Sequence, residues 1–355
     1  MPVIEQQVMV VIRSVRAFLN LQAGLTRSEA APPPPWLPRG GEESGGELEA
    51  TRRELEDARR RLAKVRARLT EGGAEAGGIK PENIVWIFGS PKTGSTWLSW
   101  MMGELRGHAV WREPYVGQLF GRLYNNWVGE KHFDSKHFIL GGPQKDSWLN
   151  SVRNFILSEA SARFPEVANG GHLVVKEPNG SIGAPLIMEA LPESRMIFLI
   201  RDPRDVAASH VDSSRKGSYM YERRKAGKHA ARFEMEADDL VGNMAKSYVK
   251  NVSNAKEAYE AHHGPKVLVR YEDLRSDTLG EMRRIYSTLG IAVDEQELRQ
   301  AVEKHSWESI PEDEKGEGKF HRKATPGGWR EDLTPEQAET VERITAPLLR
   351  ELYPG

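Results

Sequence analysis

The segment FGSPKTGSTW, residues 88–97, has the pattern of a phosphate-binding loop with its lysine in an unusual place. In the common P-loop, two glycines five residues apart are followed directly by lysine and then by serine or threonine. Gly89 and Gly94 keep this spacing, but Ser95 follows Gly94, and the lysine, Lys92, comes two residues before it. The segment predicts an anion-binding loop and leaves open whether ATP is its ligand.

Strand and helix patterns alternate on both sides of this loop. Such alternation predicts an α/β fold, with a P-loop-like central parallel sheet flanked by helices. Ligands of these sheets bind beyond the carboxyl ends of the strands, so the loops that follow the strands should lie together. The expected strands are 84–88, 172–176, 196–200 and 266–270, and the expected helices are 95–105, 182–191, a helix opening at 203–211, 238–261, 278–289, 294–304 and 334–352.

Composition points to an ordinary soluble chain. The 355 residues carry a formal net charge of -1, which gives no broad basic field for nucleic acid, and no nucleic-acid partner is expected. The chain has no cysteine, which fits a reducing compartment. It shows neither a membrane-spanning apolar run nor a signal-peptide layout, so a cytoplasmic location is expected.

The first part of the chain predicts a helical extension. Leu48, Leu55, Leu62 and Leu69 recur every seven residues, which indicates a short coiled coil that either forms a homodimer or packs on its own domain. An N-terminal amphipathic helix would suit either a dimer or peripheral membrane contact. The expected segments are an amphipathic helix at 1–30, a Pro/Gly linker at 31–45, the coiled-coil-like helix at 46–70, a Gly-rich linker at 71–81 and the main domain at 82–355.

Two further elements look suited to phosphate. Arg201 follows a predicted strand, and Ser209 lies two turns into the next helix, although a salt bridge from Arg201 to Asp202 or Asp205 is an alternative. Arg322 and Lys323 stand beside a glycine turn, where the alternative is a solvated basic loop. Together with the first loop, these elements suggest a nucleotide with phosphates at two separate places; that loop offers backbone N–H groups, Lys92 and the hydroxyls of Thr93, Ser95 and Thr96.

Five segments in this order resemble the motifs of the PAPS-dependent sulfotransferases, whose donor is 3′-phosphoadenosine 5′-phosphosulfate. The resemblance covers roughly residues 82–352, and its last motif departs from the family in having Ala324 where a glycine is usual. The segments are PKTGSTW (91–97), MIFLIRDPRDVAAS (196–209), RYEDL (270–274), KHSWESI (304–310) and RKATPGGW (322–329).

The resemblance implies roles for individual residues, with PAPS as co-substrate, PAP as product and no metal. Lys92 would reach the oxygen that bridges phosphate and sulfate, and Thr93, Gly94, Ser95 and Thr96 would supply N–H and O–H donors. The 3′-phosphate would be bound by Arg201, Ser209, Arg322 and Lys323, and adenine would lie among Trp97, Tyr271, Ser306 and Trp307.

The general base departs from the phenol and steroid branch of the family. That branch has a histidine in K-T-H-L-P after its second strand, where this chain has Pro178 in VKEPNG. The stretch is more similar to the tyrosylprotein branch and to many bacterial members, which use a glutamate shortly after the P-loop helix. Glu113 matches that place, with Lys176 assisting at the transferred group. The alternative bases are Glu177, His210 and His108.

The acceptor is less defined. Segments 115–133 and 210–227 are the expected acceptor-binding parts, and they suit a hydroxyl of a sugar, a glycolipid or a phenol. Two other functions stay open. One is an ATP-dependent kinase or P-loop NTPase with Asp202 on Mg²⁺, and the other is a non-catalytic coiled-coil scaffold that binds PAP.

Overall fold

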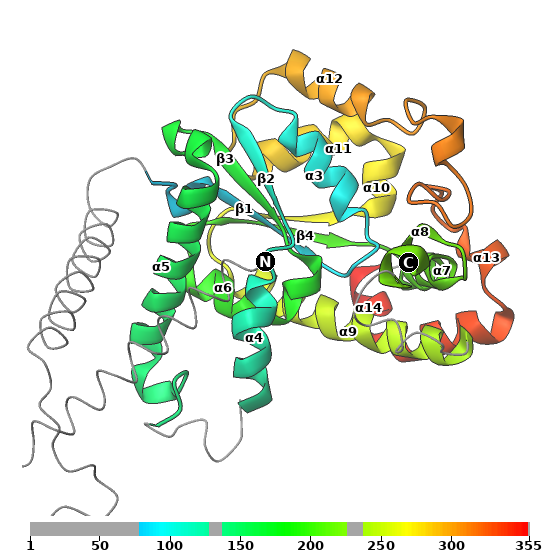
Figure 1. Cartoon of the computed structure of the whole chain (residues 1–355), viewed down its shortest axis with the longest axis horizontal. Coiled ribbons are helices and arrows are strands. Elements are labelled where there is room, and N and C mark those ends of the chain that lie inside the picture. Colours follow the sequence, from blue (N-terminus) through cyan, green and yellow to red (C-terminus); the bar gives the residue numbers. More distant parts are fainter. Residues whose placement is uncertain (1–77, 128–136, 226–236, 354–355) are drawn as a thin grey trace, which may run out of the picture. The chain divides into compact units, whose positions relative to one another are not determined.

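The computed structural model describes residues 78–127, 137–225 and 237–353 (Figure 1). The chain divides into two compact units, Met1–Thr70 and Glu71–Gly355, and the described residues belong to the second. The helical extension, its linkers and its heptads therefore lie outside the described residues and stay predictions. Within the described parts, no helix has both the length and the apolarity needed to cross a membrane.

Five parallel strands form the centre of this unit, in the order β2-β3-β1-β4-β5. The predicted fold class is confirmed, and the four expected strands are present. One strand, β2, was missed by the sequence analysis, because its five residues begin with histidine, end with arginine and lie at the sheet edge. The strands are β1 (Ile84–Gly89), β2 (His108–Arg112), β3 (His172–Lys176), β4 (Arg195–Ile200) and β5 (Lys266–Arg270).

Helices cover both faces of the sheet (Figure 1). Because side chains alternate along a strand, Trp86 and Phe88 of β1 pack on one face and Val85 and Ile87 on the other. The first face contacts α5, α6, α9 and α14, and the second contacts α3, α10, α11 and α12. The α-helices are α3 (Ser95–Gly103), α4 (Val116–Trp127), α5 (Lys145–Arg163), α6 (Ala184–Ala190), α7 (Pro203–Ser214), α8 (Tyr219–Lys225), α9 (Ala237–Ala261), α10 (Tyr271–Ser276), α11 (Thr278–Thr288), α12 (Glu295–Lys304), α13 (Trp329–Asp332) and α14 (Pro335–Leu352).

Several helices differ from expectation. The helix expected at 182–191 starts as a 3-10 turn and becomes α-helical only at Ala184, because Gly183 ends the turn and Pro185 suits a first helical turn. Neither α4 nor α5 was expected from the sequence. The 3-10 helices are η1 (Pro81–Asn83), η2 (Gly142–Gln144), η3 (Pro165–Asn169), η4 (Pro178–Gly183) and η6 (Glu312–Glu314).

Backbone-to-backbone contact fixes α4 against η4, the turn that follows β3. A Cβ atom on Gly121 would lie 2.2 Å from Cα of Gly183, and one on Gly117 would lie 1.9 Å from the carbonyl oxygen of Gly180. Real Cβ atoms do not approach so closely, so only glycine allows this packing. The contact sets the position of α4 and of the loop between β2 and α4.

Adding a methyl group at this contact should destabilise the protein. We expect Gly121→Ala to lower the free energy of unfolding by about 2 kcal/mol, because the backbone of η4 must shift to make room. Gly242→Ala is the matched control, since Gly242 lies in helix α9 with no neighbouring atom within 4 Å. Alanine should there stabilise by about 0.5–1 kcal/mol. Urea unfolding of both variants checks this, and equal effects at the two sites would contradict the packing argument.

Candidate active site

The carboxyl ends of all five strands open into one cleft of about 2270 Å³. The order of the strands along the chain reverses at β1, which lies between β3 and β4 in the sheet. Doubly wound sheets bind their ligands at such a point. Each strand contributes at least one lining residue. These are Lys92 after β1, Glu113 after β2, Lys176 at the end of β3, Arg201 after β4 and Tyr271 after β5. The prediction that the strand-end loops lie together is confirmed.

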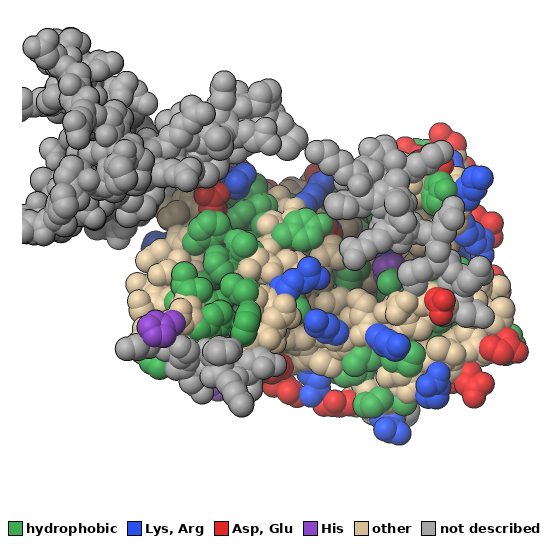
Figure 2. Space-filling model, turned by 60° about the horizontal axis from the view of Figure 1, so that its bottom comes forward, with side chains coloured by type: hydrophobic (Ala, Val, Ile, Leu, Met, Phe, Trp, Pro, Cys, Tyr) green, Lys and Arg blue, Asp and Glu red, His purple; other side chains and the backbone are tan. Residues whose placement is uncertain are grey.

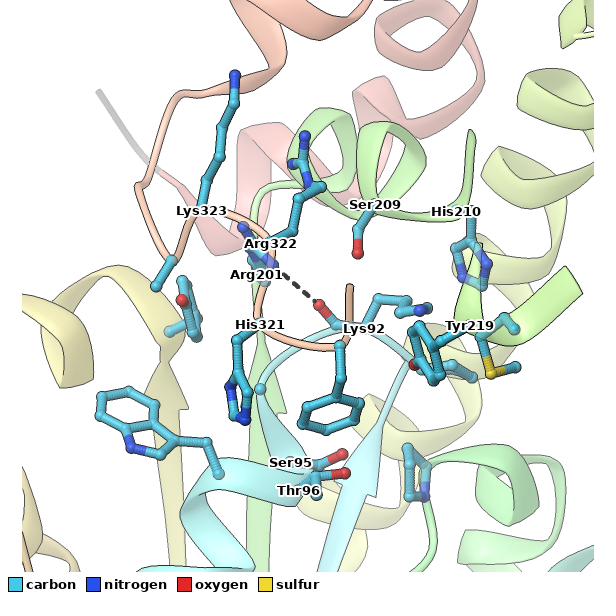
Figure 3. Close-up of a pocket in the computed structure, with 18 of the residues that line it drawn as sticks. Lys92, Ser95, Thr96, Arg201, Ser209, His210, Tyr219, His321, Arg322 and Lys323 are labelled. Atoms are coloured by element: carbon cyan, nitrogen blue, oxygen red, sulfur yellow. Dashed lines mark hydrogen bonds between the residues drawn. The ribbon is translucent and has the colours of Figure 1, made fainter. Parts of the chain in front are cut away.

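The glycine loop leads from β1 into the amino end of α3. Lys92 has a φ of 71° and Gly94 a φ of 88°, so the loop turns through the left-handed region at both residues. A Cβ on Gly94 would lie 2.6 Å from the ring of Tyr271, which requires glycine there. Ser95 begins α3, and its hydroxyl and that of Thr96 face the cleft (Figure 3). Anions are favoured at such a helix start.

Thr93 differs from this arrangement. Its side chain is fully buried, and its hydroxyl donates to the carbonyl oxygen of Ser90 at 2.8 Å. It does not line the cleft, so its hydroxyl shapes the loop rather than facing a ligand.

Arg201 braces the glycine loop. Its Nη1 donates to the carbonyl oxygen of Lys92 at 3.2 Å, and its guanidinium lies 4.3 Å from the ring centroid of Tyr271 (Figure 3). Asp202 pairs with Arg204 at 2.6 Å and accepts the Arg204 N–H at the start of α7. Asp205 accepts the backbone N–H groups of Gly327 and Trp329, and among the described residues Arg201 forms no ion pair with either aspartate. The alternative of such a salt bridge is wrong.

The basic loop that contains Arg322 is held on α7 by Asp205. This fully buried carboxylate accepts the backbone N–H groups of Gly327 at 2.8 Å and Trp329 at 3.0 Å. This role was not expected from the sequence, because no local pattern shows that an aspartate at the start of a helix binds a loop more than a hundred residues away. The contact brings Arg322 and Lys323 to the same side of the cleft as Arg201 and Ser209 (Figure 3).

Both basic side chains of this loop already have carboxylate partners. Arg322 forms an ion pair with Asp332, and Lys323 lies 2.9 Å from Asp332 and 2.8 Å from Glu331. The alternative of a simply solvated basic loop is therefore wrong. Ala324, at the family's glycine position, has a φ of 51°, which explains why glycine is usual there.

Three aromatic side chains also line the cleft, and one of them, Tyr271, lies against Arg201. Trp97 donates its indole N–H to the carbonyl oxygen of His305 at 2.7 Å and meets the Tyr271 ring edge-on, with 6.1 Å between centroids. Trp307 lies under the ammonium group of Lys315 at 5.2 Å. Ser306 does not line the cleft, and its hydroxyl accepts the backbone N–H of Ser309.

An ion pair joins Glu113 and Lys176 at the floor of the cleft. Oε1 of Glu113 lies 2.5 Å from Nζ of Lys176, and the same Nζ lies 3.4 Å from the hydroxyl of Thr96. The side chain of Lys176 is 8% exposed and that of Glu113 is 29% exposed, so the carboxylate is the more accessible of the two, and both residues line the cleft. The loop carrying Glu113 is tight, with φ values of 48° at Glu113 and 61° at Tyr115.

The alternative bases differ in their access to the cleft. Glu177 is fully buried, does not line the cleft, and accepts the backbone N–H of Tyr115 on Oε2 at 3.0 Å. His108 starts β2, at the amino edge of the sheet, and stacks on His172 with 5.2 Å between centroids. Its place far from the carboxyl ends excludes it as the base. His210 lines the cleft from α7.

Metal chemistry has no evident ligand set here. Across the described ranges, no group of three or more His, Asp or Glu side chains has the arrangement of a metal site. Asp202, the residue expected to hold Mg²⁺ in a kinase or NTPase, is bound to Arg204 through both carboxylate oxygens.

Known proteins point to one family. The family model described as "Sulfotransferase domain" matches residues 82–352. Sulfotransferase 2A2 of Rattus norvegicus is 24% identical over 176 residues, which cover 46% of this chain and 59% of the rat protein, less than two thirds of its length. Cytosolic sulfotransferase 12 of Arabidopsis thaliana is 24% identical over 300 residues, covering 69% of this chain and 86% of the plant protein.

Solved sulfotransferase structures are similar at lower identity. Mouse sulfotransferase SULT7A1 complexed with PAP superposes with a TM-score of 0.48 and 14% identity, covering 77% of this chain and 86% of the mouse chain. Sulfotransferase STF9 from Mycobacterium avium gives a TM-score of 0.47 and 14% identity, covering 82% of this chain and 80% of that chain.

The buried carboxyl of Glu177 should make stability depend on pH. Burial raises the pKa of Glu177 from 4.5 to about 7, so the folded protein keeps a proton that the unfolded chain releases. Stability contributed by this group therefore falls as pH rises from 4.5 to about 7 and stays low above it. Glu177→Gln removes the loss, which amounts to about 3 kcal/mol at most. We expect its melting temperature to exceed wild type at pH 8 by several degrees, and by clearly less at pH 5. A gap that does not change with pH would contradict the assignment.

Proposed function

Because the chain belongs to the family of PAPS-dependent sulfotransferases, we propose that this cleft transfers the sulfuryl group of PAPS to an acceptor hydroxyl, with Glu113 as the base. The products are PAP and a sulfate ester. One observation carries the proposal: the ends of β1, β2, β3 and β4 bring Lys92, Glu113, Lys176 and Arg201 into one cleft.

The donor-binding residues divide by charge and shape. Lys92, the N–H groups of 92–96 and the hydroxyls of Ser95 and Thr96 would hold the 5′-phosphosulfate at the start of α3. Arg322 and Lys323 would release Asp332 and bind the 3′-phosphate in its place. Arg201 and Ser209 would bind the same phosphate. Trp97, Tyr271 and Trp307 would surround the adenine, since all three line the cleft.

The ion pair suits the proton transfer. Glu113 takes the proton of the acceptor hydroxyl while the acceptor oxygen bonds to sulfur and the bond from sulfur to the phosphate oxygen breaks. That phosphate oxygen gains negative charge, which Lys92 and Lys176 stabilise. Lys176 also orients Glu113, because its Nζ reaches both Glu113 and Thr96. Positioning then supplies much of the rate.

An apolar stripe along α4 favours an amphiphilic acceptor. Tyr115, Leu119, Leu123 and Trp127 recur every four residues, so they share one side of the helix over about 18 Å. They are between 38% and 57% exposed. Tyr115 also lines the cleft, so the stripe begins two residues after the proposed base.

The stripe belongs to a larger apolar face. Hydrophobic side chains gather on the side of the molecule that carries α4 and α5 (Figure 2). Within the described residues, six of the seven exposed large hydrophobic side chains lie there: Tyr115, Leu119, Leu123, Trp127, Ile139 and Phe155. Contiguous apolar surface of this kind marks binding sites. Of the expected acceptors, an alkylated sugar such as a glycolipid fits best, with its hydroxyl at Glu113 and its hydrocarbon on the stripe.

Location and assembly stay proposals. The cysteine-free composition and the similarity to a cytosolic Arabidopsis protein favour the cytoplasm. Dimerisation or membrane contact through the first 70 residues rests on the sequence pattern alone.

Nucleotide binding tests the donor assignment. We expect PAP at 100 times its Kd to stabilise the protein by about 2.7 kcal/mol, a shift of a few degrees. ATP with Mg²⁺ and AMP, each at the PAP concentration, should shift the melting temperature less. Lys92→Ala should abolish transfer from PAPS. A shift with ATP–Mg²⁺ alone would establish an NTPase, and a PAP shift without turnover on any acceptor would establish the PAP-binding scaffold.

A second variant tests the assignment of Glu113 as the base. Glu113→Gln should keep the PAP shift and lower kcat about 100-fold or more, because the amide cannot take the proton. His210→Gln is the comparison, since His210 also lines the cleft. A larger loss with His210→Gln than with Glu113→Gln would move the base to the histidine.

Chain length tests the acceptor class. With alkyl glucosides of increasing length, kcat/KM should rise about twofold to fourfold per methylene, since each buried methylene contributes about 0.8 kcal/mol. Leu119→Ser with Leu123→Ser should flatten this slope and leave the PAP shift unchanged. Ile139→Ser, on the same apolar face but off the stripe, should leave the slope unchanged, because the hydrocarbon follows the stripe. If the slope is unchanged and the dimer mass or the vesicle binding changes instead, the stripe binds a second copy of the chain or a membrane and not the acceptor.

A further inference from the structure

Glu177 reaches from the end of β3 to the start of α4. Its carboxylate is fully buried, and its Oε2 accepts the backbone N–H of Tyr115 at 3.0 Å. The backbone N–H of Gly117 lowers the pKa of this carboxylate, whose Oε1 is buried without a hydrogen-bond partner among the residues that the structure describes. Tyr115 directly precedes α4, so Glu177 accepts a backbone N–H at the start of the helix.

This contact supports a loop in a sparsely populated conformation. Glu113 and Tyr115 both have positive φ values, which persist only where the surroundings enforce them. Two neighbouring residues of β3 and its loop hold the two ends. Glu113 donates its N–H to the carbonyl oxygen of Lys176 at 2.8 Å, and Tyr115 donates its N–H to Glu177.

The fold keeps room for this carboxylate. A Cβ on Gly180 would lie 1.9 Å from Oε1 of Glu177, so any larger residue at 180 would displace the carboxylate. The charged groups around it are Glu113, which raises its pKa, and Lys176, which lowers it, and burial is the larger influence. The protein thus accepts an unfavourable burial to retain an acceptor at this point, as active sites commonly do.

We propose that Glu177 is a positioning residue for the base: its carboxylate fixes the backbone of 113–115 so that the Glu113 side chain meets Lys176 and the cleft. The proposal rests on the proposed function. It also explains why a second glutamate follows Lys176 without reaching the cleft.

The test is a double-variant cycle measured by PAPS turnover. Glu177→Gln keeps the length of the side chain but exchanges one acceptor oxygen for an NH₂ group. We expect kcat to fall about 10-fold to 100-fold, as for a small displacement of a catalytic group. The KM for PAPS and the PAP thermal shift should stay unchanged. In a Glu113→Gln background, Glu177→Gln should lower kcat by less than about threefold, roughly the margin within which independent mutations add. The further loss is small because the carboxylate that Glu177 positions is already gone.

Other outcomes overturn the proposal. Multiplying losses in the double variant would mean that Glu177 acts independently of Glu113, and an unchanged kcat in the single variant would mean that it positions nothing. A loss of kcat together with a lower melting temperature at pH 8 would indicate a structural role only. Glu166→Gln, an exposed glutamate, is the matched control. Failure of the proposed function is distinct, since the wild type itself would then not transfer sulfuryl groups.

Discussion

The pairing of β1 on both of its edges is the constraint on which the site depends. Its neighbours are β3 and β4, and all six of its residues are buried. A strand so confined delivers the glycine loop to one point, between the loops of its two neighbours. The strand also packs into the core on both faces of the sheet, through Trp86 and Phe88 on one face and Val85 and Ile87 on the other. The geometry of the cleft therefore follows from the middle of the sheet.

The floor of the cleft depends on two adjacent residues that face different ways. Lys176 points its ammonium group at Glu113, and Glu177 turns its carboxylate toward the start of α4. Next to them, α4 packs directly on the backbone of η4 at Gly117 and Gly121, with no side chain between the two elements. A charged pair in the cleft is thus supported by close backbone packing beneath it.

Much of the fold was predictable because the motifs lie on strongly apolar strands. The glycine loop, Arg201, Tyr271 and Lys176 each follow such a strand, so order along the sequence was enough to place them together. β2 was missed because it is a short edge strand, although Glu113 was selected through its resemblance to the family. α4 was missed although Leu119, Leu123 and Trp127 recur every four residues, and its position depends on glycine contacts with a distant turn.

Long-range partners were the other gap. The aspartate that holds the basic loop lies more than a hundred residues before it, and the family's glycine position is filled by an alanine in a left-handed conformation. Thr93 and Ser306 matched motifs by type, but their hydroxyls turned out to bond locally. A motif identifies a segment, whereas side-chain direction depends on the packing around it.

The carboxylate of Asp332 has a consequence for turnover. It pairs with both Arg322 and Lys323, and Lys323 pairs with Glu331 as well. On the proposed donor binding, the arrival of a phosphate would therefore replace one anion by another. Such replacement weakens attraction for any single anion, yet it keeps both cations oriented between cycles. On the proposed donor binding, Asp332 would pair again with Arg322 and Lys323 as PAP leaves, so the carboxylate would compete with the product for these cations.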